Sequence, residues 1–273
     1  MAKHDITIFS KPWPDGSLSE LADKIAGLGA DGVELAVRPG YQVTPETMGE
    51  LLPRAVRVFA ERGLRIASIA SEADERAVAA CGAAGVPLIR VMAPIDMEIG
   101  YLASVDRHRQ RFDALLPALG RHGVAIGVQN HYGNFVGSAV GLLHLLKDYD
   151  PRQVCAVLDA AHCAVDGEPV AMAVDILKDR IPLLVNFKSA YHARVTQPED
   201  EADFKVKWTT HRHGGYSWAE FARCLEAIGF TGTVCLPAGY SDPAGTSQRM
   251  GDSVLPYLRE DLAHLRGLIA GRG

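Results

Sequence analysis

The sequence lacks several patterns that mark common classes of protein. No apolar run approaches the roughly 20 residues needed to span a bilayer. The amino-terminal MAKHDITIF has neither the charged start nor the apolar core of a secretion signal. None of the five cysteines forms a CxxC pair, and most lie in apolar contexts. We therefore expect a protein of the reducing cytoplasm that has no membrane partner.

Clustered basic charge is also missing. The formal net charge is -5, and the lysines and arginines are scattered along the chain. A nucleic-acid surface needs such residues gathered on one face, so nucleic acid is not an expected partner. No GxGxxG follows the first strand-like segment, which argues against an open dinucleotide-binding sheet.

The most prominent pattern in the sequence is a regular alternation. Short β-branched runs alternate with longer amphipathic stretches, which predicts a parallel sheet, and eight rounds predict closure into a barrel. We therefore predict an α/β fold, a (β/α)8 TIM barrel forming a single domain over residues 1–273. The eight predicted strands are Asp5–Ser10, Gly32–Val37, Arg65–Ala70, Leu88–Ala93, Ala125–Asn130, Cys155–Asp159, Leu183–Lys188 and Gly232–Leu236.

Helix signals lie between these strands. Ser17 and Glu20 have the spacing of a capping box and open a predicted helix over Leu18–Leu28. Thr44-Pro-Glu46 opens the next one, with proline tolerated in the first turn. The other predicted helices are Glu72–Cys81, Asp106–Arg121, Ser138–Lys147, Ala171–Lys178, Ser217–Ile228 and Asp252–Ile269.

Polar residues at the carboxyl ends of barrel strands point into the active site. Asp159 is the clearest candidate, because an unpaired acid in the buried strand VCAVLDAAH would cost several kcal/mol and so needs a cation or strong hydrogen-bond donors. Glu34 is either a catalytic group or a structural ion-pair partner. The His211-Arg-His213 loop is a weak metal signal and is more often solvated or substrate-facing. Further candidates at strand exits are Lys11, Trp13, Arg38, Gln129, His131, His162, Asn186 and Lys188.

Taken together, these segments resemble the sugar phosphate isomerase/epimerase group of the xylose-isomerase-like TIM barrels. The resemblance covers nearly the whole chain and rests on KPW, GADGVELAVRPGYQV, VQNHYG, LDAAH, VNFKSA, HGGYSWAEFARCLEAIGFTGTV and LPAGYSD. It implies a small-molecule substrate, a sugar or sugar derivative, and is compatible with a homo-oligomer.

The resemblance also implies one divalent ion, Mn²⁺, Mg²⁺, Co²⁺ or Zn²⁺, held at the ends of strands five to eight. By position its ligands fall on Gln129, Asp159, Asn186 and Pro237, of which only Asp159 keeps the family's residue. One carboxylate with two amides is a poor site for Mg²⁺ or Mn²⁺. We therefore leave open whether Asp159, Gln129 and Asn186 bind a metal, with His162 or His213 as a further ligand.

Three functions remain after this comparison. The first is an isomerase or epimerase acting on a sugar or related polyhydroxy carbonyl compound, with Asp159, Glu34 or His162 as base and Lys188 or Lys11 stabilising the enolate oxygen. In that function the residues that bind substrate are Lys11, Trp13, Arg38, Gln129, His131, Asn186 and His213. The second is a noncatalytic sugar-binding barrel that has lost the metal site. The third is a dehydratase or lyase on a sugar-like substrate, using the same enolate chemistry.

Overall fold

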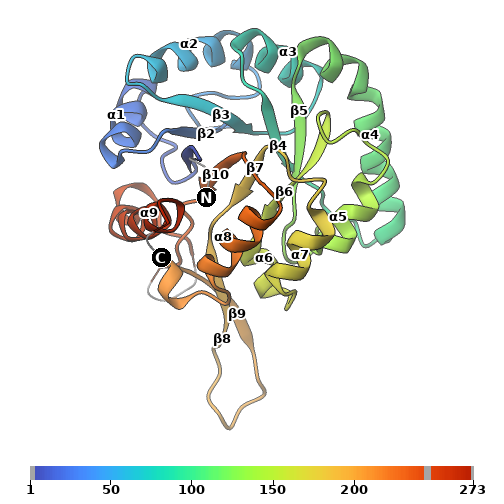
Figure 1. Ribbon diagram of the computed structural model, residues 1–273, viewed down its shortest axis with the longest axis vertical. Coiled ribbons are helices and arrows are strands. Elements are labelled where there is room, and N and C mark those ends of the chain that lie inside the picture. Colours follow the sequence, from blue (N-terminus) through green and yellow to red (C-terminus); the bar gives the residue numbers. More distant parts are fainter. Residues whose placement is uncertain (1–3, 243–246, 272–273) are drawn as a thin grey trace.

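The computed structural model describes residues 4–242 and 247–271, and in it eight parallel strands close into a barrel (Figure 1). Neighbouring strands follow the order β1-β10-β7-β6-β5-β4-β3-β2, and β1 pairs with both β10 and β2. The predicted (β/α)8 barrel is therefore confirmed. Its strands are β1 (Ile6–Phe9), β2 (Gly32–Ala36), β3 (Arg65–Ala70), β4 (Leu88–Met92), β5 (Ala125–Gln129), β6 (Val154–Asp159), β7 (Leu184–Asn186) and β10 (Thr233–Leu236).

Helices surround the barrel, and their termini follow local sequence signals. The first helix spans Leu18–Leu28 as predicted, with the Ser17–Glu20 capping box formed and Gly29 ending the helix at a φ of 73°. The helices are α1 (Leu18–Leu28), α2 (Met48–Ala60), α3 (Glu75–Ala84), α4 (Tyr101–His122), α5 (Ala139–Leu146), α6 (Ala160–Val165), α7 (Val170–Leu177), α8 (Trp218–Ala227) and α9 (Leu255–Ile269), with short 3-10 turns at His211–His213 and Gly251–Val254. None of these helices has both the length and the apolarity to cross a membrane.

Several boundaries differ from the prediction, and the short helix α6 was not predicted. Helix α2 begins at Met48, because hydrogen bonds between Thr44 and Thr47 make a separate turn first. Helix α4 begins at Tyr101, directly after Gly100, whose φ of 88° lies outside the helical region. The short helix α6 follows β6 immediately, capped by the Asp159 side chain.

An antiparallel hairpin was not predicted. Strands β8 (Ser189–Arg194) and β9 (Phe204–Thr209) pair with each other between β7 and α8 and project away from the barrel (Figure 1). The outer part of the hairpin is exposed, but Ala190 and Trp208 near its base are buried against α6. The hairpin therefore adds Trp208 to the barrel's carboxyl end.

The core has two layers. Large apolar side chains, such as Phe59 and Phe221, fill the space between strands and helices. Inside the barrel the apolar residues are mostly smaller, and polar side chains replace them toward the carboxyl ends of the strands. The inner apolar set is Phe9, Ala36, Ala70, Leu88, Ala125, Cys155, Val157, Leu184 and Cys235.

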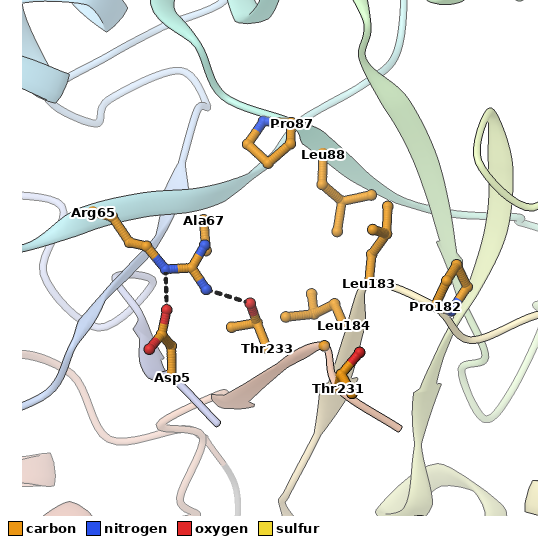
Figure 2. Close-up of a pocket in the computed structure, with 11 residues that line it drawn as sticks. Asp5, Arg65, Ala67, Pro87, Leu88, Pro182, Leu183, Leu184, Thr231 and Thr233 are labelled. Atoms are coloured by element: carbon orange, nitrogen blue, oxygen red, sulfur yellow. Dashed lines mark hydrogen bonds and ion pairs between the residues drawn. The ribbon is translucent and has the colours of Figure 1, made fainter. Parts of the chain in front are cut away.

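A cavity of about 310 Å³ opens at the amino ends of the strands (Figure 2). There the Arg65 guanidinium pairs with the Asp5 carboxylate at 2.7 Å and donates a 2.6 Å hydrogen bond to the Thr233 hydroxyl. In barrels of this type the amino-terminal end serves stability, and the active site lies at the opposite end.

Candidate functional site

A chain of hydrogen-bonded polar side chains crosses the carboxyl end of the barrel. The Arg90 guanidinium on β4 donates to both Glu34 carboxylate oxygens on β2, at 2.7 and 2.9 Å, and to the Gln129 oxygen on β5, at 2.5 Å. The Gln129 amide nitrogen donates to Asp159 Oδ2 at 2.8 Å, and the Asn186 amide nitrogen donates to the same oxygen at 3.3 Å. Five strands are thereby linked through one continuous network.

Glu34 and Arg90 form the buried ion pair at one end of this network. Glu34 has no exposed surface, Arg90 is 6% exposed, and the Ser68 hydroxyl adds a third hydrogen bond to the Glu34 carboxylate at 3.1 Å. A buried carboxylate needs such full compensation. Of the two interpretations of Glu34, the structure therefore favours the ion-pair partner over a group that reaches substrate.

Asp159 is held from several sides. Its backbone N–H donates to the Asn130 side-chain oxygen at 2.8 Å, and the Asn130 amide donates back to its carbonyl at 3.1 Å. Its Oδ1 accepts from the Ala161 N–H at 3.1 Å, at the start of α6. Burial raises the pKa of Asp159, and the Lys188 ammonium acts in the opposite direction. The carboxylate is thus a fixed part of the network beneath the pocket.

Above the network lies a pocket of about 110 Å³ at the carboxyl ends of the strands. Most of the residues predicted at strand exits line it together, although they come from positions throughout the chain. Its polar lining consists of Lys11, Arg38, Arg90, Gln129, His131, His162, Asn186, Lys188 and Gln248.

Lys188 lies at the exit of β7, and its ammonium rests 3.4 Å from the centre of the Trp208 ring. Burial is the main cause that lowers the pKa of Lys188 to about 8, and the nearby cations Lys11 and Arg90 act in the same direction, while Asp159 opposes them. The backbone opposite is tight, since a Cβ on Gly239 would lie 3.3 Å from Lys188 Cε. The adjoining Ala238 has a φ of 51°, a left-handed conformation that alanine seldom adopts.

Two imidazoles, packed against each other with their planes tilted by 35°, form another side of the pocket. The rings of His131 and His162 are 4.1 Å apart, and burial lowers the pKa of both, that of His131 to about 4. His131 Nδ1 lies 2.8 Å from the Tyr132 carbonyl, so this nitrogen carries the proton and Nε2 is left as an acceptor. His162 Nε2 lies 3.6 Å from Asp159 Oδ2, beyond hydrogen-bond distance. Both rings are neutral near pH 7.

The donor set at this site does not fit a divalent ion. Gln129 uses its oxygen to accept from Arg90, and turning the amide over would place two donors against each other. Asp159 Oδ2 already faces two amide N–H groups, so among the candidate ligands only Asn186 Oδ1 is a buried acceptor without a partner. Over residues 4–242 and 247–271, no three His, Cys, Asp or Glu side chains gather as a metal would require. The buried Arg90 guanidinium is a fixed positive charge in the same network.

Two predicted substrate contacts lie elsewhere in the structure. Trp13 is buried and lines a separate cavity of about 340 Å³ beside α1, where its indole N–H donates to Asp252 at 3.2 Å. His213 is exposed on the 3-10 turn that follows the hairpin and is not among the residues lining the pocket. The structure therefore does not bring either residue together with Asp159 and Lys188.

Four residues of the site were not singled out from the sequence. Arg90 carried a signal, because a lone arginine within the apolar run LIRVM requires a buried partner. Asn130 was placed at the exit of strand five, but its hydrogen bonds with Asp159 could not be predicted from the sequence. Trp208 and Gln248 reach the site through the hairpin and a distant loop, and no local pattern marks them.

A closed eight-strand barrel with its polar groups at the strand carboxyl ends defines a class of enzyme-like α/β barrels. Within that class, the model of the family described as the xylose isomerase-like TIM barrel matches residues 22–266. The chain belongs to this family, and the resemblance noted in the sequence is confirmed. A search among curated proteins finds no match.

Solved structures of the same superfamily align over almost the entire chain. D-psicose 3-epimerase from Clostridium cellulolyticum H10, solved with D-tagatose, is 15% identical with a TM-score of 0.72, covering 97% of this chain and 99% of that one. A xylose isomerase-like barrel from Mycobacterium smegmatis, solved with magnesium, is 15% identical with a TM-score of 0.71 and coverages of 99% and 98%. The probable 3-DHS dehydratase of Bacillus anthracis is 15% identical with a TM-score of 0.69 and coverages of 96% and 98%. At these identities the likeness concerns the fold.

Proposed function

We propose that this protein is an isomerase or epimerase that moves a proton at a carbon next to the carbonyl of a sugar or related polyhydroxy compound. One observation carries the proposal: Lys188 places its amine in a pocket lined by neutral imidazoles, with Asp159 fixed beneath them. Membership of the xylose isomerase-like family and the similarity to a D-psicose 3-epimerase support the same class of chemistry.

Lys188 is the proton carrier in this proposal. With its pKa lowered to about 8, the amine is neutral in part of the molecules at pH 7 and so can take a proton from carbon. The Arg90 guanidinium, also in the pocket lining, supplies positive charge for the enolate oxygen that forms. In an isomerisation the proton returns from Lys188 to the former carbonyl carbon, while the hydroxyl proton of the neighbouring carbon transfers to the former carbonyl oxygen. In an epimerisation the proton returns to the same carbon after the enolate has turned its other face toward Lys188.

The remaining polar groups bind and orient the substrate. His131 Nε2 and the unpartnered Asn186 Oδ1 are acceptors for substrate hydroxyls. Asp159 and Glu34 are positioning residues in this scheme, because neither is among the residues lining the pocket. His162 lines the pocket above Asp159 as a neutral imidazole.

No step uses a metal, because the hydrogen bonds of Gln129 and Asp159 leave Asn186 Oδ1 as the one free acceptor among the candidate ligands. We also propose a cytoplasmic protein, supported by free cysteines of which four are buried. A homo-oligomer and the absence of a nucleic-acid partner stay predictions from the sequence.

The test is solvent proton exchange. Ketoses, their phosphates and hydroxy-keto acids are incubated with the protein in D2O, and deuterium at the carbon next to the carbonyl is followed by NMR. Lys188→Met should lower the exchange rate by about 100-fold or more, the range lost with a general acid–base group. Lys147→Met, at an exposed lysine after α5, is the matched control and should leave the rate unchanged.

The same assay separates the two alternative functions. A dehydratase, supported by the similar probable 3-DHS dehydratase, would release water and give a product of lower mass. A sugar-binding barrel would bind a compound without any exchange. Exchange that survives in Lys188→Met would contradict the assignment of Lys188.

A further inference from the structure

The pocket at the carboxyl ends of the strands has an unusual charge balance. Its described lining contains four cationic side chains, Lys11, Arg38, Arg90 and Lys188, and no carboxylate. A pocket for a neutral sugar needs hydroxyl donors and acceptors but no excess of one charge. The excess therefore needs an explanation.

Three of the four cations make their close contacts with neutral groups. Lys11 donates to the Gln248 side-chain oxygen at 2.7 Å. The Arg38 guanidinium lies 5.4 Å from the Phe9 ring centre, and the Lys188 ammonium rests on Trp208. Amides and aromatic faces orient a cation without cancelling its charge. Only Arg90 is in an ion pair, with Glu34.

The buried carboxylates do not offset this charge. The charge of Glu34 is balanced by its ion pair with Arg90. Asp159 is then the one remaining carboxylate of the network, and it cannot balance the three cations Lys11, Arg38 and Lys188. Burial lowers the pKa of Lys11, and repulsion from Arg38 and Arg90 lowers it further. Cations that repel one another in a partly desolvated pocket are stabilised when an anion enters.

We propose that the substrate carries a carboxylate or phosphate group, which binds between Lys11 and Arg38. These residues follow the neighbouring strands β1 and β2, and only β10 lies between β1 and β7, at whose exit Lys188 is located. An anionic group held by Lys11 and Arg38 leaves the carbonyl end of the substrate to Lys188 and Asn186. Beside Arg38 a second cavity of about 350 Å³ shares Arg38, Arg90 and Met92 with the pocket, which gives room for a group as large as phosphate. The one carboxylate of its described lining, that of Glu72, is exposed and paired with Arg111 at 3.1 Å. The inference rests on the proposed function and names the substrate class of the same site.

Calorimetric titration of the full chain with matched compounds tests the inference. The probes are D-fructose, D-fructose 6-phosphate, D-gluconate and inorganic phosphate, each at low and at raised salt. The anionic compounds should bind at least about 10-fold more tightly than D-fructose, with the advantage reduced at raised salt. The better of the phosphate and carboxylate probes identifies which anion the site prefers.

Variants locate the effect. Lys11→Met and Arg38→Met should each weaken binding of the anionic probes by about 10- to 100-fold, as expected for a hydrogen bond to a charged group, and should weaken D-fructose binding much less. Arg121→Met, at an exposed arginine in the last turn of α4, is the matched control. Thermal unfolding of each variant confirms that it folds.

The outcomes separate this inference from the proposed function. Equal binding of neutral and anionic sugars, or an anion preference that survives in both variants, would overturn the inference. Proton exchange into D-fructose without any anion preference would overturn it while the proposed function stands. Tight anion binding without any proton exchange would support the inference and contradict the proposed function.

Discussion

The two ends of this barrel differ in how far their ion pairs are exposed to water. At the amino end, Arg65 and Asp5 form an ion pair whose side chains are 43% and 46% exposed (Figure 2). At the carboxyl end, Arg90 and Glu34 form an ion pair whose side chains are 6% and 0% exposed. Water screens the first pair, whereas the second lies inside a network that includes Gln129 and Asp159.

Cavity size alone does not identify the pocket, because the amino-terminal cavity and the cavity of about 350 Å³ beside Arg38 are both larger than it. The amino-terminal cavity is about 310 Å³ and the carboxyl-terminal pocket about 110 Å³. In the larger cavity the described charged groups, Asp5 and Arg65, satisfy each other. In the smaller pocket the cations outnumber the carboxylates that can pair with them. Cations without a carboxylate partner in the protein therefore indicate a ligand site in this molecule better than cavity volume does.

Removing the buried cation should have the largest effect on folding. Arg90→Met leaves the Glu34 carboxylate buried without its partner, and the free energy of unfolding should fall by about 3–5 kcal/mol. Urea unfolding followed by circular dichroism measures this change. Adding Glu34→Leu to Arg90→Met should recover most of the loss, because both charges are then absent. A double variant as unstable as Arg90→Met would show that the pair is not the source of the effect.

The pH dependence of proton exchange tests whether the carboxyl-end pocket lowers the pKa of Lys188. Lys188 accepts a proton only when neutral, and its pKa is lowered to about 8, so kcat/KM should rise about tenfold per pH unit below pH 8 and then level off. In Lys11→Met one neighbouring cation is gone, so the pKa of Lys188 and the midpoint of the profile should move to higher pH. A rate that still climbs steeply above pH 9 would match an ordinary lysine instead.

The exposed ion pair should contribute much less to stability. Arg65→Ala removes the contacts to Asp5 and Thr233, and the free energy of unfolding should fall by about 1 kcal/mol or less. The same urea experiment measures it beside Arg90→Met. A loss as large as that of the buried pair would mean that exposure does not explain the difference between the two ends.

Metal removal should have no effect at either end. Because Gln129 and Asp159 are already committed to hydrogen bonds, treatment with EDTA should leave proton exchange unchanged. The unfolding temperature should likewise not change on adding Mg²⁺, Mn²⁺, Co²⁺ or Zn²⁺. Full inactivation by EDTA with recovery on adding one of these ions would contradict the absence of a metal site.

Much of the fold was predictable because its signals are local. The strand β3 has its predicted bounds, and α1 agrees at both ends through its capping box and Gly29. The β8–β9 hairpin was missed because the segment after β7 was expected to lead to a helix. With the hairpin missed, the contact between Trp208 and Lys188 was missed as well.

The site was predictable in part. The predicted strand exits bring Lys11, Arg38, Gln129, His131 and Asn186 to the lining of one pocket, because parallel strands end at the same side of a barrel. That rule places a residue at the mouth but does not give the direction of its side chain. Trp13 follows β1 as predicted and yet turns toward α1 and Asp252.

The sequence by itself determined the alternation of strands and helices, and thereby the barrel and the end that carries the polar residues. These features depend on the spacing of apolar residues and on caps within a few positions of each other. Only the tertiary structure decided which charges cancel. Glu34 and Arg90 are 56 positions apart, and Lys11 and Gln248 are 237 apart. Pairing at such separations follows from closure of the barrel. Closure brings together side chains that no local sequence pattern predicts to be in contact.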